Sequence, residues 1–391
     1  MKSTHRGTNQ IAVRSYNERL LLQLVRSRGE LTKAEATRVS MLSANATSVI
    51  FRKLESDGLV IRGNRVLGKR GQPSTPMKIN PDAHLYVSLK IGRRSVEIGV
   101  VDFAGEIRSQ RKETFQYPTP NGVLGFVKNT LNLVLKEAKI QSDDVTAMAV
   151  AMPFELWSWA EDFNAPRAEL EQWRELDIKQ ELSSLVPWSI SVENDGTAAC
   201  RAEQVFGSHN NKQDWIYFFV GTFIGGGVVL NGSVFPGRRG NAGGFGPLRV
   251  PDIEGGERLV DHASLIVLES ALLKEGMDPS AIYLEDANWE DLRHHWDLWL
   301  KRAGKSLAHA IVSSLSILDF DSVVIDGSIP SSIKELLVSE VIHQLNEIDM
   351  QGVHFPVVEA GQIGRNARLI GAAGTLISRD YLLDQNTIMR T

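Results

Sequence analysis

The sequence predicts an α/β protein in which a winged helix-turn-helix domain precedes a larger, two-lobed α/β body. Three observations lead to this prediction. Positive charge is concentrated in the first 80 residues, helical and short strand patterns follow one another there, and strands alternate with helices from Pro81 onward.

Composition restricts the class of protein. The 391 residues are 42% hydrophobic and 23% charged, which is typical of a globular chain with two or three domains. The single cysteine, Cys200, excludes an internal disulfide and any zinc site built from several thiolates. The chain has no apolar run of roughly 18 residues, the length of a membrane-spanning helix, and its N-terminus lacks the apolar core of a signal peptide. We therefore expect a cytoplasmic protein.

Charge is distributed unevenly along the chain. Residues 1–80 hold 15 Lys and Arg against 5 Asp and Glu, a net charge of +10, so the remainder must carry −14 of the total of −4. A basic head on an acidic body suggests that the head contacts a polyanion. On charge alone, a solvated basic face is the alternative.

Three helices are expected in the head. Apolar residues recur at helical spacing over 20–25, and Gly29 closes this segment. Thr32 followed by Glu35 has the form of a capping box that starts a second helix. Ser43 is the expected N-cap of a third helix. A short turn between the second and third helices makes the unit a helix-turn-helix, whose third helix enters the DNA major groove.

The third helix and the segment after it supply the candidate DNA contacts. We expect Val49, Ile50 and Leu54 to form the buried stripe of this helix. The run 59–80 indicates two short strands around a basic loop, which is a wing. A small helical docking domain with a basic surface is the alternative. The candidate DNA-binding residues are Ser43, Asn45, Thr47, Ser48 and Arg52 on the helix, and Arg62, Arg65, Lys69 and Arg70 on the wing.

The body carries motifs of a known family. The glycine-rich run Gly221–Gly227 (GTFIGGG) is followed by glycines at 232, 237, 240 and 243, and it is preceded by the triplet Glu193-Asn194-Asp195 (END). With the winged head, GQP and NPDA before them, these motifs resemble the ROK family of repressors, open reading frames and sugar kinases. The head resembles the NagC/XylR-type repressor branch.

The resemblance implies an actin-like, sugar-kinase-like body. It places the winged helix-turn-helix at 1–80, the first ROK lobe at 81–200 and the second, effector-binding and oligomerisation lobe at 201–371. A C-terminal helix, 372–391, is expected to return to the first lobe. The resemblance also implies a homodimer or homotetramer.

The chain departs from the kinases of this family at the early phosphate-binding turn. Their motif has the form DxGGT, and the matching residues here run from Lys90 to Arg94, so the acid is a lysine, while a glycine and the threonine are Arg93 and Arg94. Long cationic side chains obstruct close backbone approach to a phosphate, and the metal-organising carboxylate is absent. We therefore expect no catalytic residue, no enzyme activity and no cofactor.

The zinc and sugar motifs of the family are also altered. The resemblance aligns a sugar-contacting acid with Gly244 and a zinc-binding histidine with Pro247, and the loop contains no cysteine, so no metal site is expected. Asp195 occupies the position of the catalytic base and is expected to hydrogen-bond to a ligand hydroxyl; a strand-end aspartate capping the next helix is the alternative. The candidate effector-binding residues are Glu169, Asn194, Asp195, Gly225, Gly226 and Asp261.

These observations predict a transcriptional repressor that binds a double-stranded DNA operator and is controlled by a sugar or sugar-like effector between the lobes, with no membrane partner. Two alternatives stay open. One is a constitutive DNA-binding protein whose body only oligomerises. The other is an active sugar kinase fused to a DNA-binding head, against which Lys90, Arg93 and Arg94 argue.

Overall fold

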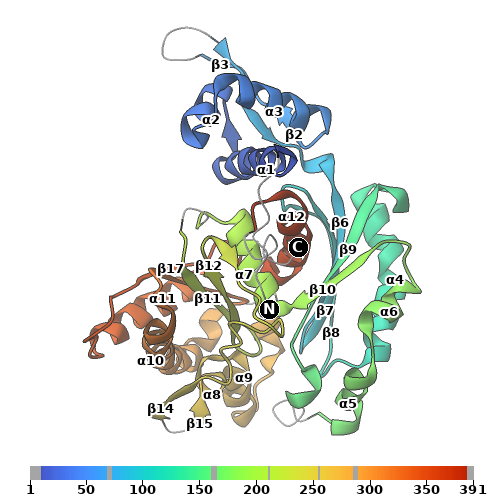
Figure 1. The fold of residues 1–391 in the computed structure, drawn as a ribbon. Coiled ribbons are helices and arrows are strands. Elements are labelled where there is room, and N and C mark those ends of the chain that lie inside the picture. Colours follow the sequence, from blue (N-terminus) through green and yellow to red (C-terminus); the bar gives the residue numbers. More distant parts are fainter. Residues whose placement is uncertain are drawn as a thin grey trace, which may run out of the picture.

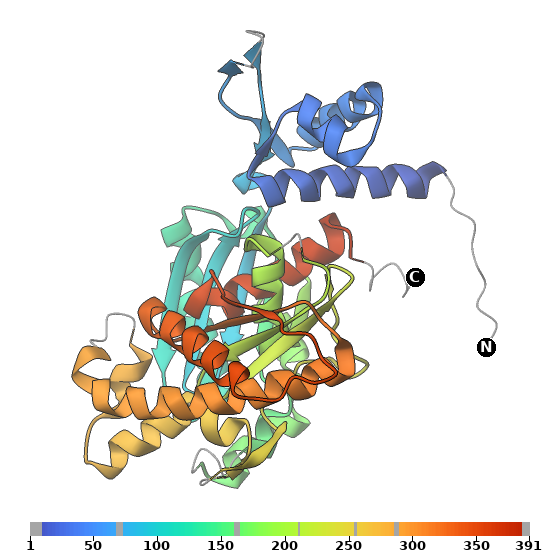
Figure 2. The ribbon, with the colours of Figure 1, turned by 90° about the vertical axis from the view of Figure 1, so that its left-hand side faces the viewer.

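The computed structural model describes residues 10–67, 73–159, 165–209, 212–253, 256–284 and 289–384. A small head stands on a larger body that contains two five-stranded sheets (Figures 1 and 2).

The head has the order of elements expected for a winged helix-turn-helix. Strands β1, β5 and β2 form one antiparallel sheet in the order β1-β5-β2, and β3 and β4 extend the hairpin between β2 and β5. The elements are α1 (Gln10–Arg28), β1 (Glu30–Leu31), α2 (Lys33–Ser40), α3 (Ala44–Ser56), β2 (Val60–Arg62), β3 (Val66–Leu67), β4 (Pro73–Ser74) and β5 (Met77–Ile79).

Local capping explains why the head helices begin where they do. Thr32 and Glu35 form the expected capping box, in which each side chain accepts a hydrogen bond from the backbone N–H of the other residue. The Ser43 hydroxyl accepts from the N–H of Ala46 and caps α3, as expected. Met41 adopts a left-handed conformation, φ 57°, in the turn between α2 and α3.

The first sheet of the body has the strand order β10-β9-β6-β7-β8. Strand β9 runs parallel to β6 and β10, whereas β6, β7 and β8 form an antiparallel meander. Strands β6 and β7 are buried along their whole length, so the sheet is covered on both faces. Its elements are β6 (Leu85–Ile91), β7 (Ser95–Asp102), β8 (Ile107–Thr114), α4 (Pro120–Ala138), β9 (Val145–Met152), α5 (Arg167–Glu175), α6 (Ile178–Ser183) and β10 (Ile190–Asn194).

The second sheet has the order β13-β12-β11-β16-β17, with β11, β16 and β17 parallel. Its elements and the helices around it are α7 (Asp195–Phe206), β11 (Trp215–Val220), β12 (Gly225–Leu230), β13 (Ser233–Val234), β14 (Arg249–Ile253), β15 (Gly256–Arg258), α8 (Val260–Ala263), α9 (Leu265–Lys274), α10 (Arg293–Leu318), β16 (Ser322–Gly327), α11 (Ser331–Asn346), β17 (Val357–Ala360) and α12 (Ala367–Tyr381).

Helices α7 and α12 form a layer between the two sheets (Figure 1). Helix α12 packs on β6 and β9 and also on α7, which packs on β12; α4 covers the other face of the first sheet, and α10 and α11 lie beyond the second. The chain passes from one sheet to the other through α7, so residue 200, the expected lobe boundary, lies within this helix. Helix α12 begins at Ala367 and ends at Tyr381, whereas the expected helix spanned 372–391; residues 385–391 lie outside the described chain.

Candidate functional site

The outward face of α3 in the head carries part of the predicted DNA contacts. Ser43, Asn45 and Arg52 are exposed, and Ser48 is half-buried. The Arg52 Nε donates to the Ser48 carbonyl at 3.3 Å, which holds the guanidinium along the helix. These side chains are therefore accessible from solvent on one helix.

The prediction that Thr47 is exposed and Val49 buried is wrong. Thr47 is fully buried, and Val49 is 40% exposed. The buried face of α3 consists of Thr47, Ile50, Phe51 and Leu54, which is the i, i+3, i+4, i+7 stripe of a helix packed on a core. Thr47 is the first position of that stripe, so it cannot reach a DNA base.

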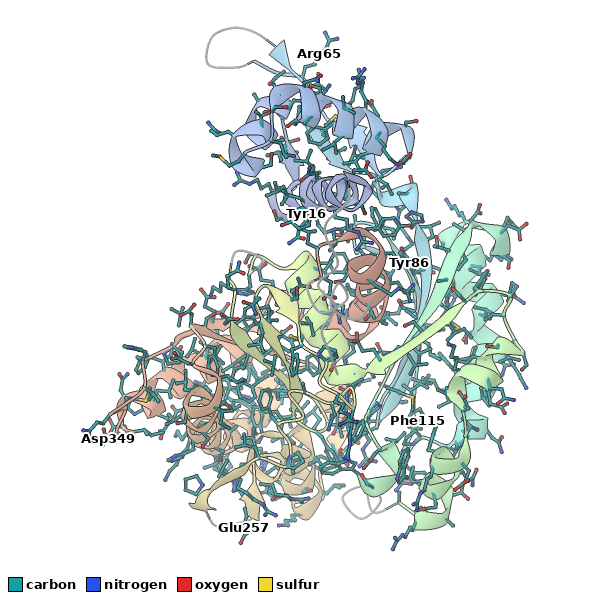
Figure 3. All side chains as sticks on the ribbon, viewed as in Figure 1. Tyr16, Arg65, Tyr86, Phe115, Glu257 and Asp349 are labelled. Carbon is teal, nitrogen blue, oxygen red and sulfur yellow. The ribbon has the colours of Figure 1, made fainter. Side chains whose placement is uncertain are left out.

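The hairpin of the head carries the predicted wing residues. Arg65 is exposed and lies at the end of the head that is far from the body (Figure 3). Arg62 is also exposed, but its guanidinium forms an ion pair with Glu55 on α3, with Nε 2.7 Å from Oε1. This pair leaves Arg62 less available to a phosphate than Arg65. Lys69 and Arg70 lie outside the described residues.

The body contains a cavity of about 80 Å³ beside the glycine-rich run. Four of the predicted effector-binding residues line it, namely Asn194, Asp195, Gly225 and Gly226. Gly244 and Pro247, which stand where the resemblance places a sugar-contacting acid and a zinc-binding histidine, also line it. The rest of the wall consists of Arg93, Phe154, Trp159, Gly196, Phe219, Phe223, Ile224, Asn241, Gly243, Gly246 and Arg368.

Asn194 and Asp195 lie where β10 ends and α7 begins. The Asn194 Oδ1 accepts from the N–H groups of Gly196 and Thr197 and so caps α7, while its Nδ2 donates to Asn241 Oδ1 at 3.2 Å. The cap of this helix is therefore Asn194. Asp195 instead faces Arg368 on α12, with Oδ2 3.4 Å from Nη1.

The cavity is small because aromatic and cationic side chains fill it. The Arg93 guanidinium lies 4.6 Å from the centre of the Phe223 ring and 5.7 Å from that of Trp159, and Arg368 lies 4.8 Å from the centre of Phe219. A volume of 80 Å³ is well below the range of about 300–1,000 Å³ in which small-molecule sites usually fall. A sugar can enter only if these side chains move.

The two remaining predicted effector residues lie away from this cavity. Glu169 is on α5, where its carboxylate accepts a hydrogen bond from Gln172, and it does not line the cavity. Asp261 is held by Arg258, whose Nη2 and backbone N–H both donate to its carboxylate, and it lines a separate surface depression. The structure thus brings together four of the six predicted residues.

The turn after β6, where the sequence departs from the kinases, is closed by its own side chains. Lys90 is 3% exposed, and its Nζ donates to Glu97 Oε1 at 2.9 Å and to Ser95 Oγ at 2.6 Å. Burial lowers the pKa of Lys90 to about 8, against the attraction of Glu97. Burial opposes ionisation of Glu97, but the Lys90 ammonium outweighs it and lowers the pKa of Glu97 to about 2. The Lys90–Glu97 ion pair therefore fills the space at the end of the turn with buried side chains.

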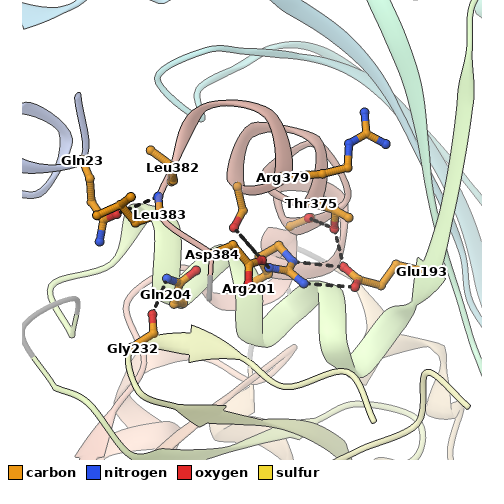
Figure 4. A network of polar contacts seen from close by, with 12 residues as sticks. Gln23, Glu193, Arg201, Gln204, Gly232, Thr375, Arg379, Leu382, Leu383 and Asp384 are labelled. Carbon is orange, nitrogen blue, oxygen red and sulfur yellow. Dashed lines mark hydrogen bonds and ion pairs between the residues drawn. The ribbon is translucent and has the colours of Figure 1, made fainter. Parts of the chain in front are cut away.

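Polar contacts connect the cavity region with the head (Figure 4). Glu193, next to Asn194, accepts hydrogen bonds from Arg201 on α7 and from Thr375 on α12. Arg201 also lies 3.5 Å from Asp384, near the end of the described chain. One residue before Asp384, the Leu383 N–H donates to the Gln23 side chain of α1 at 3.1 Å. The segment after α12 therefore contacts both the body network and the head.

A second set of contacts joins α1 directly to the body. The Arg26 guanidinium is buried, donates to the carbonyl of Phe103 at 2.7 Å and stacks over the Phe103 and Phe206 rings. Burial lowers the pKa of Arg26 to about 10. The Arg19 guanidinium donates to the carbonyls of Arg379 and Leu382. The head is thus seated on the body through specific cationic contacts.

Metal-binding clusters and membrane-spanning helices are both absent from the described part of the chain. Within the described ranges, no cluster of three or more His, Cys, Asp or Glu side chains has the geometry to hold a metal ion. Of the helices described, none combines the length and the apolar character needed to cross a membrane.

Comparison with known proteins assigns part of the body, residues 86–258, to a family. The ROK family profile matches residues 86–258. Over 386 residues the chain is 20% identical to the xylose repressor of Bacillus subtilis, in an alignment that covers 97% of this chain and 99% of that protein. A solved ROK family transcriptional regulator, a homolog of the E. coli MLC protein, matches with a TM-score of 0.63 at 19% identity and covers 93% of this chain and 95% of its own.

A kinase structure matches about three quarters of the chain. The ROK family glucokinase from Streptomyces griseus, solved with glucose and AMPPNP, aligns with a TM-score of 0.58 at 22% identity, and the alignment covers 74% of this chain and 98% of the glucokinase. The α/β fold seen here is therefore one that ROK repressors and ROK sugar kinases share. From the profile match and the two-sheet architecture we conclude that residues 86–258 form a ROK family domain.

Proposed function

We propose that this chain is a DNA-binding transcriptional repressor whose ROK body binds a sugar or sugar-like effector. The observation that carries the proposal is the outward face of α3, on which Ser43, Asn45 and Arg52 are exposed on a head of net charge +10. A helix with short polar side chains and one long cation suits the major groove, and the charge suits the phosphate backbone. The alignment with a xylose repressor over nearly the whole chain supports it.

The proposed division is a DNA-binding head at 1–80, a first lobe at 81–200 with α12, and an effector and oligomerisation lobe at 201–371. The effector would enter the cavity beside Asn194, Asp195, Gly225 and Gly226, displacing Arg93 from its aromatic neighbours. Because such a ligand changes the position of groups next to Glu193, it can bias the contacts that lead through Arg201 and Asp384 to α1. A ligand switches the head only if it binds one arrangement more tightly than the other.

The body is proposed to lack phosphoryl transfer. The buried Lys90–Glu97 pair and Arg93 occupy the turn at which the family's kinases place an acid and a phosphate loop. Purified protein incubated with ATP, Mg²⁺ and common hexoses should form no sugar phosphate. Formation that disappears in Asp195→Asn would establish a kinase instead.

DNA footprinting on genomic fragments tests the proposal. A homodimer or homotetramer presents paired heads, so we expect a pseudo-palindromic site with half-sites a whole number of helical turns apart. Asn45→Ala should cost about 1–3 kcal/mol on that site and relax preference at one base. Asn132→Ala, the same change on the exposed face of α4, is the matched control and should bind as wild type.

The hairpin is expected to contribute differently. Arg65→Ala should weaken binding to all sequences about equally and reduce the slope of log affinity against log salt by about 1. If Arg65→Ala alters base preference while Asn45→Ala does not, the roles of hairpin and helix are reversed. If the wild type protects no genomic fragment, the repressor proposal fails.

A sugar screen separates ligand-controlled regulation from the constitutive alternative. Thermal shift with xylose, glucose and N-acetylglucosamine should reveal a stabilising sugar that also changes the footprint. Protection that no sugar alters would favour a body that only oligomerises.

A further inference from the structure

One apolar side chain on α3 is exposed among the polar residues proposed to contact DNA. Val49 is 40% exposed and does not belong to the buried face of this helix. Residues three and four apart share one face of a helix, so Val49 lies in a single stripe with Asn45, Ser48 and Arg52. We call these four residues the outward stripe. Val49 is its one large apolar member.

Neither helix stability nor core packing explains a valine at this position. A β-branched residue loses rotamer freedom in a helix, and it is a weaker helix former than alanine or the long polar residues that suit an exposed face. The core of the head is completed by the opposite side of α3, with Ile50, Phe51 and Leu54. A contact with another molecule therefore explains Val49 better than the fold does.

The position of α3 in the head leaves the outward stripe accessible. The helix packs on α1, α2 and β2, and α1 lies between it and the body (Figures 1 and 2). Val49 is the sixth of the 13 residues of α3, so it belongs to the N-terminal half, the part of the second helix of a helix-turn-helix that faces base edges. The body therefore does not cover the stripe.

The charges around the stripe favour DNA as the partner. The stripe itself contains no carboxylate, and the one acid within α3, Glu55, is paired with Arg62 at 2.7 Å. Arg52 is exposed, and the head carries a net charge of +10, so a polyanion can approach Val49 without repulsion. The apolar group that base edges present in the major groove is the C5-methyl of thymine.

We propose that Val49 contacts the C5-methyl group of a thymine in the operator. This inference rests on the proposed DNA-binding function and adds to it a base contact that α3 makes without a hydrogen bond. Asn45 lies four residues earlier, which is about 6 Å along the helix axis, and base pairs are about 3.4 Å apart. The thymine therefore lies within roughly two base pairs of the base that Asn45 contacts.

Deoxyuridine tests the contact, because its base differs from thymine only in lacking this methyl group and still pairs with adenine. The full chain is titrated against the operator found by footprinting, and each thymine of a half-site is replaced in turn together with its symmetry-related counterpart. We expect one position at which replacement weakens wild-type binding about 10- to 20-fold, since each of two buried methyl groups contributes roughly 4-fold.

Val49→Ala should bind the thymine and deoxyuridine operators with equal affinity, because its shorter side chain no longer reaches the methyl group. This variant should also fold, since the position is exposed and alanine is the better helix former. Val357→Ala is the matched control, because Val357 is an exposed valine on β17 of the body. It should discriminate between the two operators as strongly as wild type.

Two results would overturn the inference. One is wild-type binding that no deoxyuridine replacement weakens, and the other is a Val49→Ala variant that discriminates between the two operators as strongly as wild type. Either result on a protected operator refutes the methyl contact and leaves DNA binding in place. Failure of the wild type to protect any genomic fragment refutes the DNA-binding function and this contact together.

Discussion

Two segments of the body border its cavity beside the glycine-rich run, and they differ in the side chains they carry. The run 221–227, which forms the turn after β11 and the start of β12, contains four glycines, whereas the run 90–95, from the end of β6 to the start of β7, carries Lys90, Arg93 and Arg94. A Cβ on Gly226 would lie 1.9 Å from the Tyr217 carbonyl oxygen, and one on Gly227 would lie 2.4 Å from the Cβ of Cys200. Packing alone therefore requires glycine at positions 226 and 227, so these two glycines are explained by the fold without a ligand.

The first prediction tests whether packing requires glycine at position 226. Gly226→Ala should destabilise the protein by more than about 4 kcal/mol or prevent folding, because the clash is with backbone of the adjacent strand. Gly225→Ala is the matched control, since no atom lies within 4 Å of its added Cβ. Thermal or chemical unfolding measures both variants. Equal stability of the two would show that a ligand, rather than packing, explains the glycines.

The second prediction concerns the cationic turn. Lys90→Met removes one partner of a buried ion pair and should cost about 3–5 kcal/mol, because Glu97 is left buried without its counter-charge. The double variant Lys90→Met/Glu97→Leu should recover most of that loss. Denaturant unfolding of the single and double variants measures how far the loss of stability depends on the unpaired Glu97 carboxylate. A double variant as unstable as the single one would mean that the turn depends on its charges for shape.

The third prediction has the smallest effect and concerns His262, which follows the glycine-rich segment. Arg302 donates to its Nδ1 at 2.7 Å, so the proton is on Nε2, which donates to the Gly256 carbonyl. Burial, and then the Arg302 charge, lower the pKa of His262 below 6.5. As the pH decreases, the imidazole therefore takes up its second proton in the unfolded chain before it does so in the folded chain. The contribution of His262 to stability is complete above pH 6.5 and falls as the pH decreases below it.

Free energies of unfolding measured from pH 7.5 to 5 test whether stability falls as the pH decreases. One proton contributes a slope of at most about 1.4 kcal/mol per pH unit. His262→Gln should flatten part of the slope, because the variant lacks the imidazole whose pKa is lowered by burial. A steeper slope in His262→Gln would contradict the hydrogen-bond assignment.

Local sequence signals predicted the head and the strand–helix alternation well. Thr32 with Glu35, and Ser43, fix helix starts through bonds within three residues, so sequence alone reveals them. The burial of Thr47 was missed because it depends on how α3 turns toward the core, and Phe51 rather than Val49 completes that face. The glycine-rich run and the Glu193-Asn194-Asp195 triplet correctly indicated four residues that line the cavity.

The remaining parts of the site depend on contacts between distant segments. Arg368 lies 173 positions from Asp195, and no local pattern indicates that α12 delivers it to the cavity. Asp261 was expected in the cavity, but Arg258, three residues before it, holds its carboxylate elsewhere. Trp159 and Asn241 both line the cavity although they are far apart in the sequence, Trp159 after β9 of the first sheet and Asn241 after β13 of the second. No short spacing in a single sequence indicates contacts between residues this far apart.

The late position of α12 in the chain has a consequence for synthesis. This helix covers one face of the first sheet, and the segment after it holds α1 through a hydrogen bond between residues 360 positions apart. During translation the head and the strands of both sheets are made before α12, so the apolar face of β6 and β9 stays exposed until residues 367–381 have been made. Ribosome-bound chains that stop before Ala367 should therefore bind chaperones and aggregate, whereas chains that extend past Asp384 should contain every contact that seats the head on the body through α12.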